Sequence, residues 1–393
     1  METIDRYYRV YAGVNLDNIY SNMKALSDNT VEGTQMVAVI KTDGYGLGAV
    51  PIARTIDELV SAYAVATIDE ALNLRRHGIT KPVYILGFIY EHRIKDAILN
   101  DVRMSVFSYD MAQAISDMAT ELGRKAYIHI KIDTGMSRIG FMADDDAAET
   151  IKKISELDNV EIEGIFTHFL ASDSADKTIA KRQLKKFVDF VELLKTKGVY
   201  IKLVHCSNSA GIIDMPEANM TEVRAGIALY GMYPSEEVDK KAVELKPALE
   251  LKSHVVFVKT VPEGTGISYG STYITDRETK VATIPVGYGD GYPRNLSNKG
   301  YVLINGKKCP ILGRVCMDQF MVDVTGMDVK EGTVATLVGN DGDEVITVEE
   351  LAELAGTFNY EFVCDLGKRI PRVYYRHGEI VCTKDYFTDV YDI

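Results

Sequence analysis

Between residues 36 and 231, short apolar runs alternate with stretches in which apolar side chains recur every three or four positions. Short runs bounded by turn signals are typical of buried strands, and the longer spacing is typical of helices that bury one face. Helices are predicted over Asp69–Arg76 and Ala180–Lys195, among others. Eight runs predict strands, at 36–40, 62–66, 82–87, 104–109, 126–133, 160–169, 202–208 and 221–231. This alternation predicts an α/β fold, a (β/α)8 TIM-type barrel.

A different pattern begins after Tyr233. Residues 232–250 are charged and irregular, and short apolar runs separated by turns follow from residue 251. These runs predict strands over His254–Lys259, Lys280–Pro285, Tyr301–Ile304, Val322–Val324, Thr333–Val338 and Arg372–Tyr375. The pair Asn305-Gly306 predicts a tight hairpin turn, and Val348–Ala355 predicts one helix. The second part of the chain is therefore predicted to be mostly β.

The two patterns divide the chain into two predicted domains. We place the barrel domain at 13–240 and the mostly-β domain at 241–393. At the N-terminus, residues 7–14 predict a strand and residues 15–28 predict a helix. That helix is expected to bury one apolar face, which consists of Leu16, Ile19, Met23 and Leu26.

Composition narrows the functional classes. The 393 residues are 46% hydrophobic and carry a net charge of −13, with no basic patch interleaved with aromatic residues, so we predict no nucleic-acid partner. The N-terminus lacks the apolar core of a signal peptide, and no apolar run reaches the ~20 residues of a membrane span. Five scattered cysteines without a Cys-x-x-Cys pair predict reduced thiols in the cytoplasm and no zinc site.

The segment Met36–Ala49, MVAVIKTDGYGLGA, is the first candidate for chemistry. It predicts a buried strand that ends at Lys41, and a glycine-rich turn that leads into a helix. A lysine in an apolar pocket has a lowered pKa, and a neutral amine can form a Schiff base. The turn glycines and the helix start suit a bound phosphate. The alternative is a lysine that extends from a strand end into water.

Further polar residues lie near the carboxyl ends of the predicted barrel strands, where barrel enzymes hold their active sites. An arginine inside an apolar strand needs a buried acceptor, and a serine before a helix can either cap the helix or bind phosphate. Taken singly, Arg138 can be a solvated loop residue and His168 a structural histidine. The candidates are Lys131, Arg138, His168, Asn208, Ser209, Arg224, Gly226 and Ile227.

The Lys41 segment closely resembles the pyridoxal-phosphate (PLP) lysine motif of alanine racemases, in which a strand ends in a lysine and Tyr-Gly-x-Gly follows four residues later. Lys41 and Tyr45 match this motif. The chain departs from it at Thr42-Asp43, where the family often has Ala-Asn, and at Leu47, where it has His. The resemblance extends over nearly the whole chain. It implies a barrel followed by a β-rich domain, with residues 1–12 joined to the second domain.

The resemblance also implies roles for the barrel residues. Lys41 carries PLP and acts as a base, while Lys131 is a candidate for carbamylation that holds Arg138 near the cofactor and the substrate carboxylate. Arg224 faces the pyridine nitrogen. Because an arginine keeps its proton, that nitrogen stays unprotonated, and the weaker electron sink suppresses side reactions such as transamination. The residues implied to bind the cofactor are Lys41, Tyr45, His168, Asn208, Ser209, Arg224, Gly226 and Ile227.

Three motifs of the predicted β domain, ISYGSTY, PVGYGDGYPR and GRVCMDQFMVDVT, resemble family motifs. By this resemblance Tyr269 is the second base, Met317 and Asp318 lie at the substrate carboxylate, and Tyr288 lines the entrance. Taken alone, a tyrosine in such a turn is usually a packing residue. In the family these residues enter the partner subunit's site, so a homodimer with shared sites is implied. Some members use a tyrosine on the phosphate where this chain has Lys368, so no C-terminal tyrosine is included among the phosphate ligands.

The resemblance therefore predicts a PLP-dependent alanine racemase, which moves one α-proton between two bases, Lys41 and Tyr269. The alternatives are a racemase of another small amino acid such as serine, a fold-related PLP decarboxylase, and a non-catalytic PLP-binding barrel. Such decarboxylases carry a glycine triplet that this chain lacks, and such barrels lack a β domain. Both D-alanine biosynthesis for peptidoglycan precursors and a catabolic role stay open.

Overall fold

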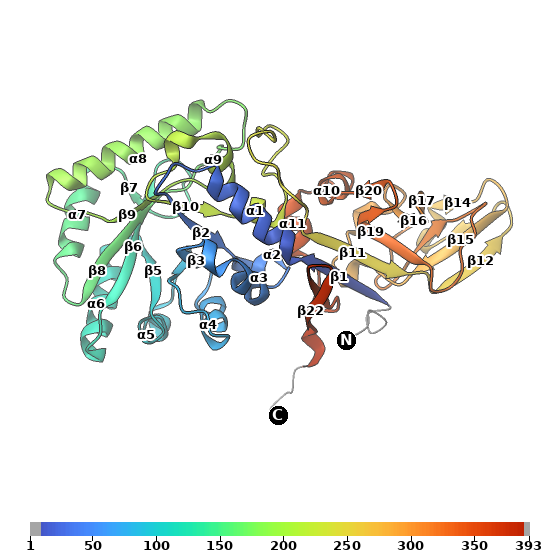
Figure 1. Ribbon diagram of the computed structural model, residues 1–393, viewed down its shortest axis with the longest axis horizontal. Helices are drawn as coiled ribbons and strands as arrows, with labels where there is room; N and C mark the ends of the chain where they lie inside the picture. Colours follow the sequence, from blue (N-terminus) through green and yellow to red (C-terminus); the bar gives the residue numbers. More distant parts are fainter. Residues whose placement is uncertain (1–8, 389–393) are drawn as a thin grey trace. The chain divides into compact units, whose positions relative to one another are not determined.

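A computed structural model describes residues 9–388, which form two compact units (Figure 1). The barrel unit consists of Ile19–Gly44 and Ala49–Lys246. The β-rich unit consists, within the described residues, of 9–18, Tyr45–Gly48 and 247–388. The predicted boundary between residues 240 and 241 stays a prediction. Among the described residues, no helix combines the length and apolar character that crossing a membrane requires.

Eight parallel strands close the barrel, which confirms the predicted fold class. Pairing of β5 with β6 and of β2 with β10 completes the ring. The strands are β2 (Gln35–Val39), β3 (Ala62–Val65), β4 (Val83–Ile85), β5 (Val102–Val106), β6 (Ala126–Asp133), β8 (Val160–Phe166), β9 (Leu203–His205) and β10 (Glu222–Ala225), with the short β7 (Phe141–Met142) paired to β6. The prediction of a strand as far as residue 231 is wrong, because a 3-10 helix follows at Ile227–Tyr230.

Helices cover the outside of the barrel, as α4 to α8 show in Figure 1. Their ends follow the capping rules: Ser108 accepts from the Met111 amide at the start of α6, and Gly123 ends that helix in the left-handed region. In α1, Ile19, Met23 and Leu26 are fully buried, as the spacing predicts. The helices are α1 (Leu16–Asp28), α3 (Ala49–Ile56), α4 (Ile68–Arg76), α5 (Ile94–Leu99), α6 (Tyr109–Leu122), α7 (Asp145–Ser155), α8 (Thr178–Thr196) and α9 (Ser209–Asp214).

The β-rich unit is built around one long sheet, in the order β12-β15-β18-β17-β16-β19-β11-β1-β21-β22. The predicted hairpin at Asn305-Gly306 is confirmed, with both residues at positive φ, as a primed turn requires. The strands of the long sheet are β1 (Val10–Asn15), β11 (Leu249–His254), β12 (Phe257–Val261), β15 (Thr279–Ile284), β16 (Tyr301–Ile304), β17 (Lys307–Leu312), β18 (Phe320–Asp323), β19 (Val334–Asp341), β21 (Arg372–Arg376) and β22 (Glu379–Lys384). The smaller elements are β13 (Gly266–Ile267), β14 (Tyr273–Ile274), β20 (Glu344–Ile346), α10 (Val348–Ala355) and α11 (Asn359–Cys364).

The prediction of one strand over His254–Lys259 is wrong, because the chain changes strand partners there. The amide of Val255 donates to Thr333, whereas the next amide donates to Thr283. At the N-terminus, β1 pairs with β11 and β21, and the earlier residues of the predicted strand 7–14 lie partly outside the described range.

The glycine-rich segment is fixed by close backbone contacts within the β-rich unit. A Cβ placed on Gly46, whose φ is +78°, would lie 2.4 Å from the carbonyl oxygen of Val363. The carbonyl oxygen of Gly46 also accepts a hydrogen bond, at 2.9 Å, from Nε of Arg372. The side chain of Arg372 is fully buried. Gly46 therefore has both a conformational and a steric reason to be glycine.

We expect Gly46→Ala to destabilise the protein more than Gly33→Ala, by roughly 1–3 kcal/mol, because only Gly46 also meets backbone atoms. Gly33 is the matched control, since it has a φ of +88° and nothing within 4 Å of an added Cβ. Chemical denaturation of both variants measures the difference. Equal losses of stability in the two variants would show that the contact with Val363 does not contribute to the effect of Gly46→Ala.

Candidate active site

A single left-handed turn follows Lys41. The strand β2 ends at Val39, and the short element α2 (Lys41–Tyr45) has left-handed dihedrals at Thr42, Asp43 and Gly44, all with φ between 51° and 65°. The φ of Tyr45 is also positive, at 52°. The prediction of a glycine-rich turn is therefore correct only in part, because the left-handed path begins at a threonine. Such a path costs about 1–2 kcal/mol per non-glycine residue, so neighbouring groups must hold it.

Glu70 provides that support, and the sequence analysis did not single it out. Its Oε1 accepts from the amide of Thr42 at 2.5 Å, and its Oε2 accepts from the amide of Ala66 at 2.8 Å. The same glutamate completes the capping box with Thr67 at the start of α4. One carboxylate thus ties the Lys41 turn to the next barrel strand and helix. The Thr-x-x-Glu spacing was visible in the sequence, but its contact with Thr42 was not.

Four predicted cations converge on His168, which follows β8. Burial, together with the positive charges of Arg224, Arg138, Lys131 and Lys41, lowers the pKa of His168 to about 3. This imidazole is therefore neutral at physiological pH. The structure thus brings together side chains that lie in β6 and β10 or follow β2, β6 and β8, near the carboxyl end of the barrel as the sequence predicted.

Lys131 lies in β6 and is buried, as predicted for a strand residue. Its Nζ donates to the Ile132 carbonyl at 2.7 Å. Burial lowers the pKa of Lys131 to about 8, with Asp133 acting in the opposite direction and Arg224 in the same one. Asp133 also orders the following loop, because its Oδ1 accepts from the amides of Gly135 at 2.8 Å and of Ser137 at 3.1 Å. That loop carries Arg138, which is exposed.

Arg224 is buried in β10, and its hydrogen bonds within the described residues all go to neutral acceptors. NH1 donates to Nδ1 of His205 at 2.9 Å. NH2 donates to the carbonyls of Thr167 at 2.9 Å and Cys206 at 3.1 Å, and to Nδ1 of His168 at 3.3 Å. Burial lowers the pKa of Arg224 to about 10, so the guanidinium stays cationic at neutral pH. No carboxylate among the described residues accepts a hydrogen bond from it.

Asn208 and Ser209 have different tasks. The capping alternative for Ser209 is wrong, because Asn208 is the N-cap of α9 and accepts from the Gly211 amide at 3.0 Å. The hydroxyl oxygen of Ser209 instead accepts from the amides of Gly226 at 2.9 Å and Ala228 at 3.3 Å. The start of α9 and the segment after β10 therefore meet around one hydroxyl group. Ile227, the first residue of the following 3-10 helix, lies between these two amides.

The predicted residues of the β-rich unit also lie together. Tyr269, Met317 and Asp318 line one hollow of about 640 Å³. Tyr269 is 69% exposed and follows Ser268, which has a positive φ of 63°. Tyr288 is linked to the same loop, because its amide donates to the Cys316 carbonyl at 3.1 Å. The hollow holds the residues that the resemblance places at the substrate.

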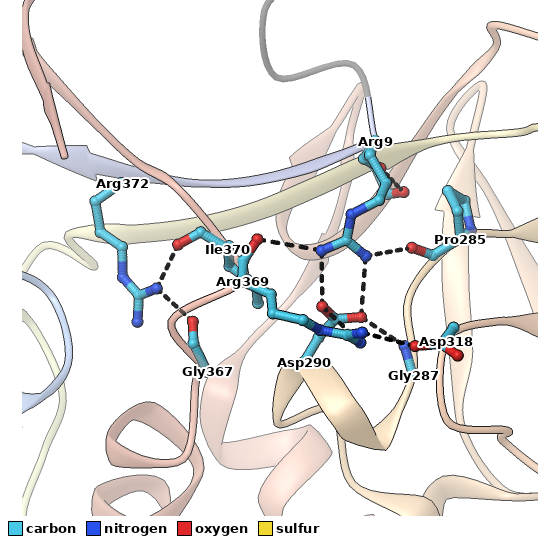
Figure 2. Close-up of polar contacts among 10 residues, drawn as sticks. Arg9, Pro285, Gly287, Asp290, Asp318, Gly367, Arg369, Ile370 and Arg372 are labelled. Carbon is cyan, nitrogen blue, oxygen red and sulfur yellow. Dashed lines mark hydrogen bonds and ion pairs between the residues drawn. The ribbon is translucent and has the colours of Figure 1, made fainter. Parts of the chain in front are cut away.

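A buried carboxylate supports this loop. Asp290 is fully buried and lies between the guanidinium groups of Arg9 and Arg369 (Figure 2). Arg9 donates to both its oxygens, at 2.7 and 3.1 Å, while Arg369 forms an ion pair with it at 3.2 Å without good hydrogen-bond alignment. Arg369 also donates to Asp318 at 2.7 Å, and Asp290 accepts from the Gly287 amide at 3.1 Å. Asp290 thus connects the turn that carries Tyr288 to Asp318, and the sequence analysis did not predict this role.

Two further predicted positions lie in the β-rich unit. Tyr45 is buried, with its ring 6.2 Å from that of Tyr360 at an angle of 49°. Burial raises the pKa of the Tyr45 hydroxyl above its usual range, so it stays a neutral donor. Lys368 is exposed beside the Arg369 segment. The roles of all these residues on a cofactor stay predictions.

Comparison with known proteins identifies relatives of the whole chain. The family model described as "Alanine racemase, N-terminal domain" matches residues 14–234, and that described as "Alanine racemase, C-terminal domain" matches residues 248–374. An alanine racemase of Methanococcus maripaludis is 45% identical over 93% of this chain and 98% of its own length. An alanine racemase structure from Clostridium difficile 630 has a TM-score of 0.93 at 39% identity, covering 96% of this chain and 98% of that one. A histidine racemase structure from Leuconostoc mesenteroides has a TM-score of 0.87 at 28% identity, covering 94% of this chain and 99% of that one.

We expect Asp290→Asn to destabilise the protein by roughly 2–3 kcal/mol, because it leaves two guanidinium groups around a site without its negative charge. Because Arg9 and Arg369 are partly exposed to water, the loss of stability should be smaller than for a wholly buried ion pair. The matched control is Asp276→Asn, which removes an exposed carboxylate paired with Arg277 and should cost well under ~1 kcal/mol. Denaturation midpoints measure both, and equal midpoints would contradict the supporting role of Asp290.

Proposed function

Because the chain belongs to the alanine racemase family, we propose that it interconverts L- and D-alanine with bound PLP. The observation that supports this most directly is the environment of Arg224, a buried cation whose described acceptors are all neutral. Such a cation suits an unprotonated pyridine nitrogen, because an arginine does not give up its proton. The resulting weak electron sink favours removal and return of one proton over other PLP reactions.

The donor set of the barrel fits PLP. A phosphate dianion needs several N–H or O–H donors, and the Ser209 hydroxyl lies against the amides of Gly226 and Ala228. When bound, PLP links covalently to a lysine amine and withdraws electrons from the substrate Cα, which acidifies the α-proton. We propose that Lys41 makes this link and that His168 and Arg224 flank the ring. The proposed phosphate-binding residues are Tyr45, Asn208, Ser209, Gly226 and Ile227.

We propose Lys41 and Tyr269 as the two bases, on opposite faces of the substrate. Tyr269 would come from the partner subunit, a proposal supported by its exposed position on the β-rich unit. His168 would assist it. Since Nδ1 of His168 accepts from Arg224, the neutral ring carries its proton on Nε2, and this N–H can stabilise a phenolate.

We propose that Arg138 and the backbone of Met317 bind the substrate carboxylate, with Asp318 beside them and Tyr288 at the entrance. Lys131 would support Arg138. A pKa of about 8 leaves part of Lys131 neutral at neutral pH, and the neutral amine can add to carbon dioxide with loss of one proton. The carbamate formed in this way is an anion that can pair with the arginine.

For assembly and location, we propose a cytoplasmic homodimer with shared sites that acts on small amino acids and has neither a nucleic-acid nor a membrane partner. The alternatives concern the substrate or the reaction. Pocket volume separates alanine from serine only weakly, since one added hydroxyl is a small change for an apolar pocket. An experiment must therefore compare substrates directly.

The test of function is α-proton exchange in deuterium oxide with a panel of L-amino acids. We expect the PLP-loaded enzyme to exchange and racemise L-alanine fastest, without release of carbon dioxide. Tyr269→Phe, which removes only the hydroxyl, should abolish exchange from L-alanine while Lys41 still exchanges the α-proton of D-alanine. Carbon dioxide release would instead select the decarboxylase, faster L-serine exchange the serine-preferring racemase, and bound PLP without any exchange the non-catalytic barrel.

A subunit-mixing experiment tests the shared site. Chains with Lys41→Ala and chains with Tyr269→Phe are each expected to be nearly inactive. A hybrid dimer should regain up to about half of the wild-type activity, because one of its two sites then carries both substitutions and the other carries neither. Mass spectrometry of the intact dimer verifies subunit exchange. Exchanged dimers without recovered activity would show that both residues serve the same chain's site.

A further inference from the structure

Behind Arg224, a chain of hydrogen bonds crosses the barrel interior. NH1 of Arg224 lies 2.9 Å from Nδ1 of His205, and Nε2 of His205 lies 3.0 Å from Nδ1 of His129. Nε2 of His129 lies 3.4 Å from Oε2 of Glu163, which also accepts from Nε of Arg103 at 3.0 Å. The five residues come from β10, β9, β6, β8 and β5, so the chain joins the cation at one end of the barrel to an ion pair further along it.

The direction of every hydrogen bond in this chain follows from its two ends. Arginine only donates, so Nδ1 of His205 must accept and its proton must be on Nε2. That N–H donates to Nδ1 of His129, whose proton is then also on Nε2 and donates to Glu163. Burial lowers the pKa of both imidazoles, so both are neutral. Burial raises the pKa of Glu163, but hydrogen bonds from His129 and Arg103 outweigh this and lower it to about 2.

Packing fixes the rings independently of these hydrogen bonds. A Cβ on Gly164 would lie 2.5 Å from the His129 ring, so only glycine leaves room for that imidazole. The His205 ring stacks on Phe166, with centroids 5.0 Å apart and planes 8° from parallel. The Tyr84 ring lies 4.3 Å from that of His129. The two histidines are therefore held in one orientation from several sides.

We propose that His205, His129 and Glu163 are positioning residues, which orient Arg224 and place its counter-charge two imidazoles away from the cofactor. This inference rests on the proposed function, because it takes Arg224 to face the pyridine ring. A carboxylate in direct contact would cancel the field of the cation at the ring, whereas a buried guanidinium without acceptors would be too costly. The neutral rings of His205 and His129 give Arg224 a hydrogen-bond acceptor without placing a negative charge next to it. Each ring of the series also polarises the next one.

Glu222 is a fully buried carboxylate near this chain, two residues before Arg224 in β10. Its Oε1 accepts from the hydroxyls of Tyr84 at 3.0 Å and Ser61 at 3.3 Å. Burial raises its pKa to about 7, so near neutral pH it is only partly ionised. Glu222 therefore acts on Arg224 directly through space, whereas Glu163, which is firmly ionised and paired with Arg103, ends the hydrogen-bond chain.

The first test needs neither cofactor nor activity. Nitrogen-15 NMR of the histidine-labelled, cofactor-free protein should show His129 and His205 as neutral rings with the proton on Nε2, unchanged from about pH 5.5 to 8.5. His129→Phe and His205→Phe assign the signals. Glu163→Gln, which keeps an acceptor but removes the charge, should shift the signals of both rings. The control Glu161→Gln, on the same strand but in an exposed pair with Lys125, should shift neither. A proton on Nδ1 of either ring, or titration in this range, would overturn the proposed direction of the chain.

The second test uses the PLP-loaded enzyme. We expect Glu163→Gln to move the absorption band of bound PLP and to lower kcat about tenfold, as is usual when an outer partner of a ligating group is removed, with KM little changed. Glu161→Gln should behave as wild type. If the band and kcat of Glu163→Gln equal those of this control, the chain only stabilises the barrel and the positioning role is wrong. If wild type neither binds PLP nor racemises, the proposed function fails, while the NMR result stands on its own.

Discussion

Positive charge gathered around one neutral imidazole is the constraint on which the active end of the barrel depends. Arg224, Arg138, Lys131 and Lys41 all lower the pKa of His168, and each comes from a different part of the barrel. Like charges repel, and burial makes the repulsion more costly. Asp133 offsets part of this charge at Lys131. A phosphate and a carboxylate, the two anionic groups of the proposed cofactor and substrate, would offset more of it.

Two charged side chains, the half-buried Glu70 and the buried Arg372, hydrogen-bond to the backbone of the segment that follows Lys41. Glu70 binds the amide of Thr42 at the start of the left-handed turn. Arg372 binds the carbonyls of Gly46, Leu366, Gly367 and Ile370, so it fixes the end of the glycine segment within the β-rich unit. Because charge-assisted hydrogen bonds are stronger than neutral ones, they can offset a strained turn. The turn after Lys41 and the glycine segment are thus each held by a charged side chain.

The sequence predicted the elements well where local patterns decide them. All eight barrel strands, the helix over Val348–Ala355 and the Asn305-Gly306 turn follow from periodicity and turn chemistry. Tertiary contacts decided the rest. The strand expected to reach residue 231 ends at Ala225, because the amides of Gly226 and Ala228 turn to the Ser209 hydroxyl.

The candidate site shows the same division. Lys41, Arg138, His168 and Arg224 were identified through motifs, and the structure gathers them around His168. The roles of Glu70, His205 and Asp290 depend on partners that are distant in sequence, such as Thr42 for Glu70. No spacing rule reports such partners. A buried histidine or aspartate looks alike in sequence whether it packs silently or supports a site.

The residues that line the hollow of the β-rich unit support the proposal that Tyr269 acts in a partner's site. A tyrosine acts as a base only where donors or cations stabilise its phenolate. The described residues that line the hollow around Tyr269 include Asp318 but no lysine, arginine or histidine. Asp318 is itself paired with Arg369, so its charge is already matched by a cation outside this lining. The barrel has the complementary excess, with cations and the Nε2–H of His168. Under the proposed shared site, Tyr269 of one subunit would meet the barrel cations of its partner, and racemisation would then depend on assembly.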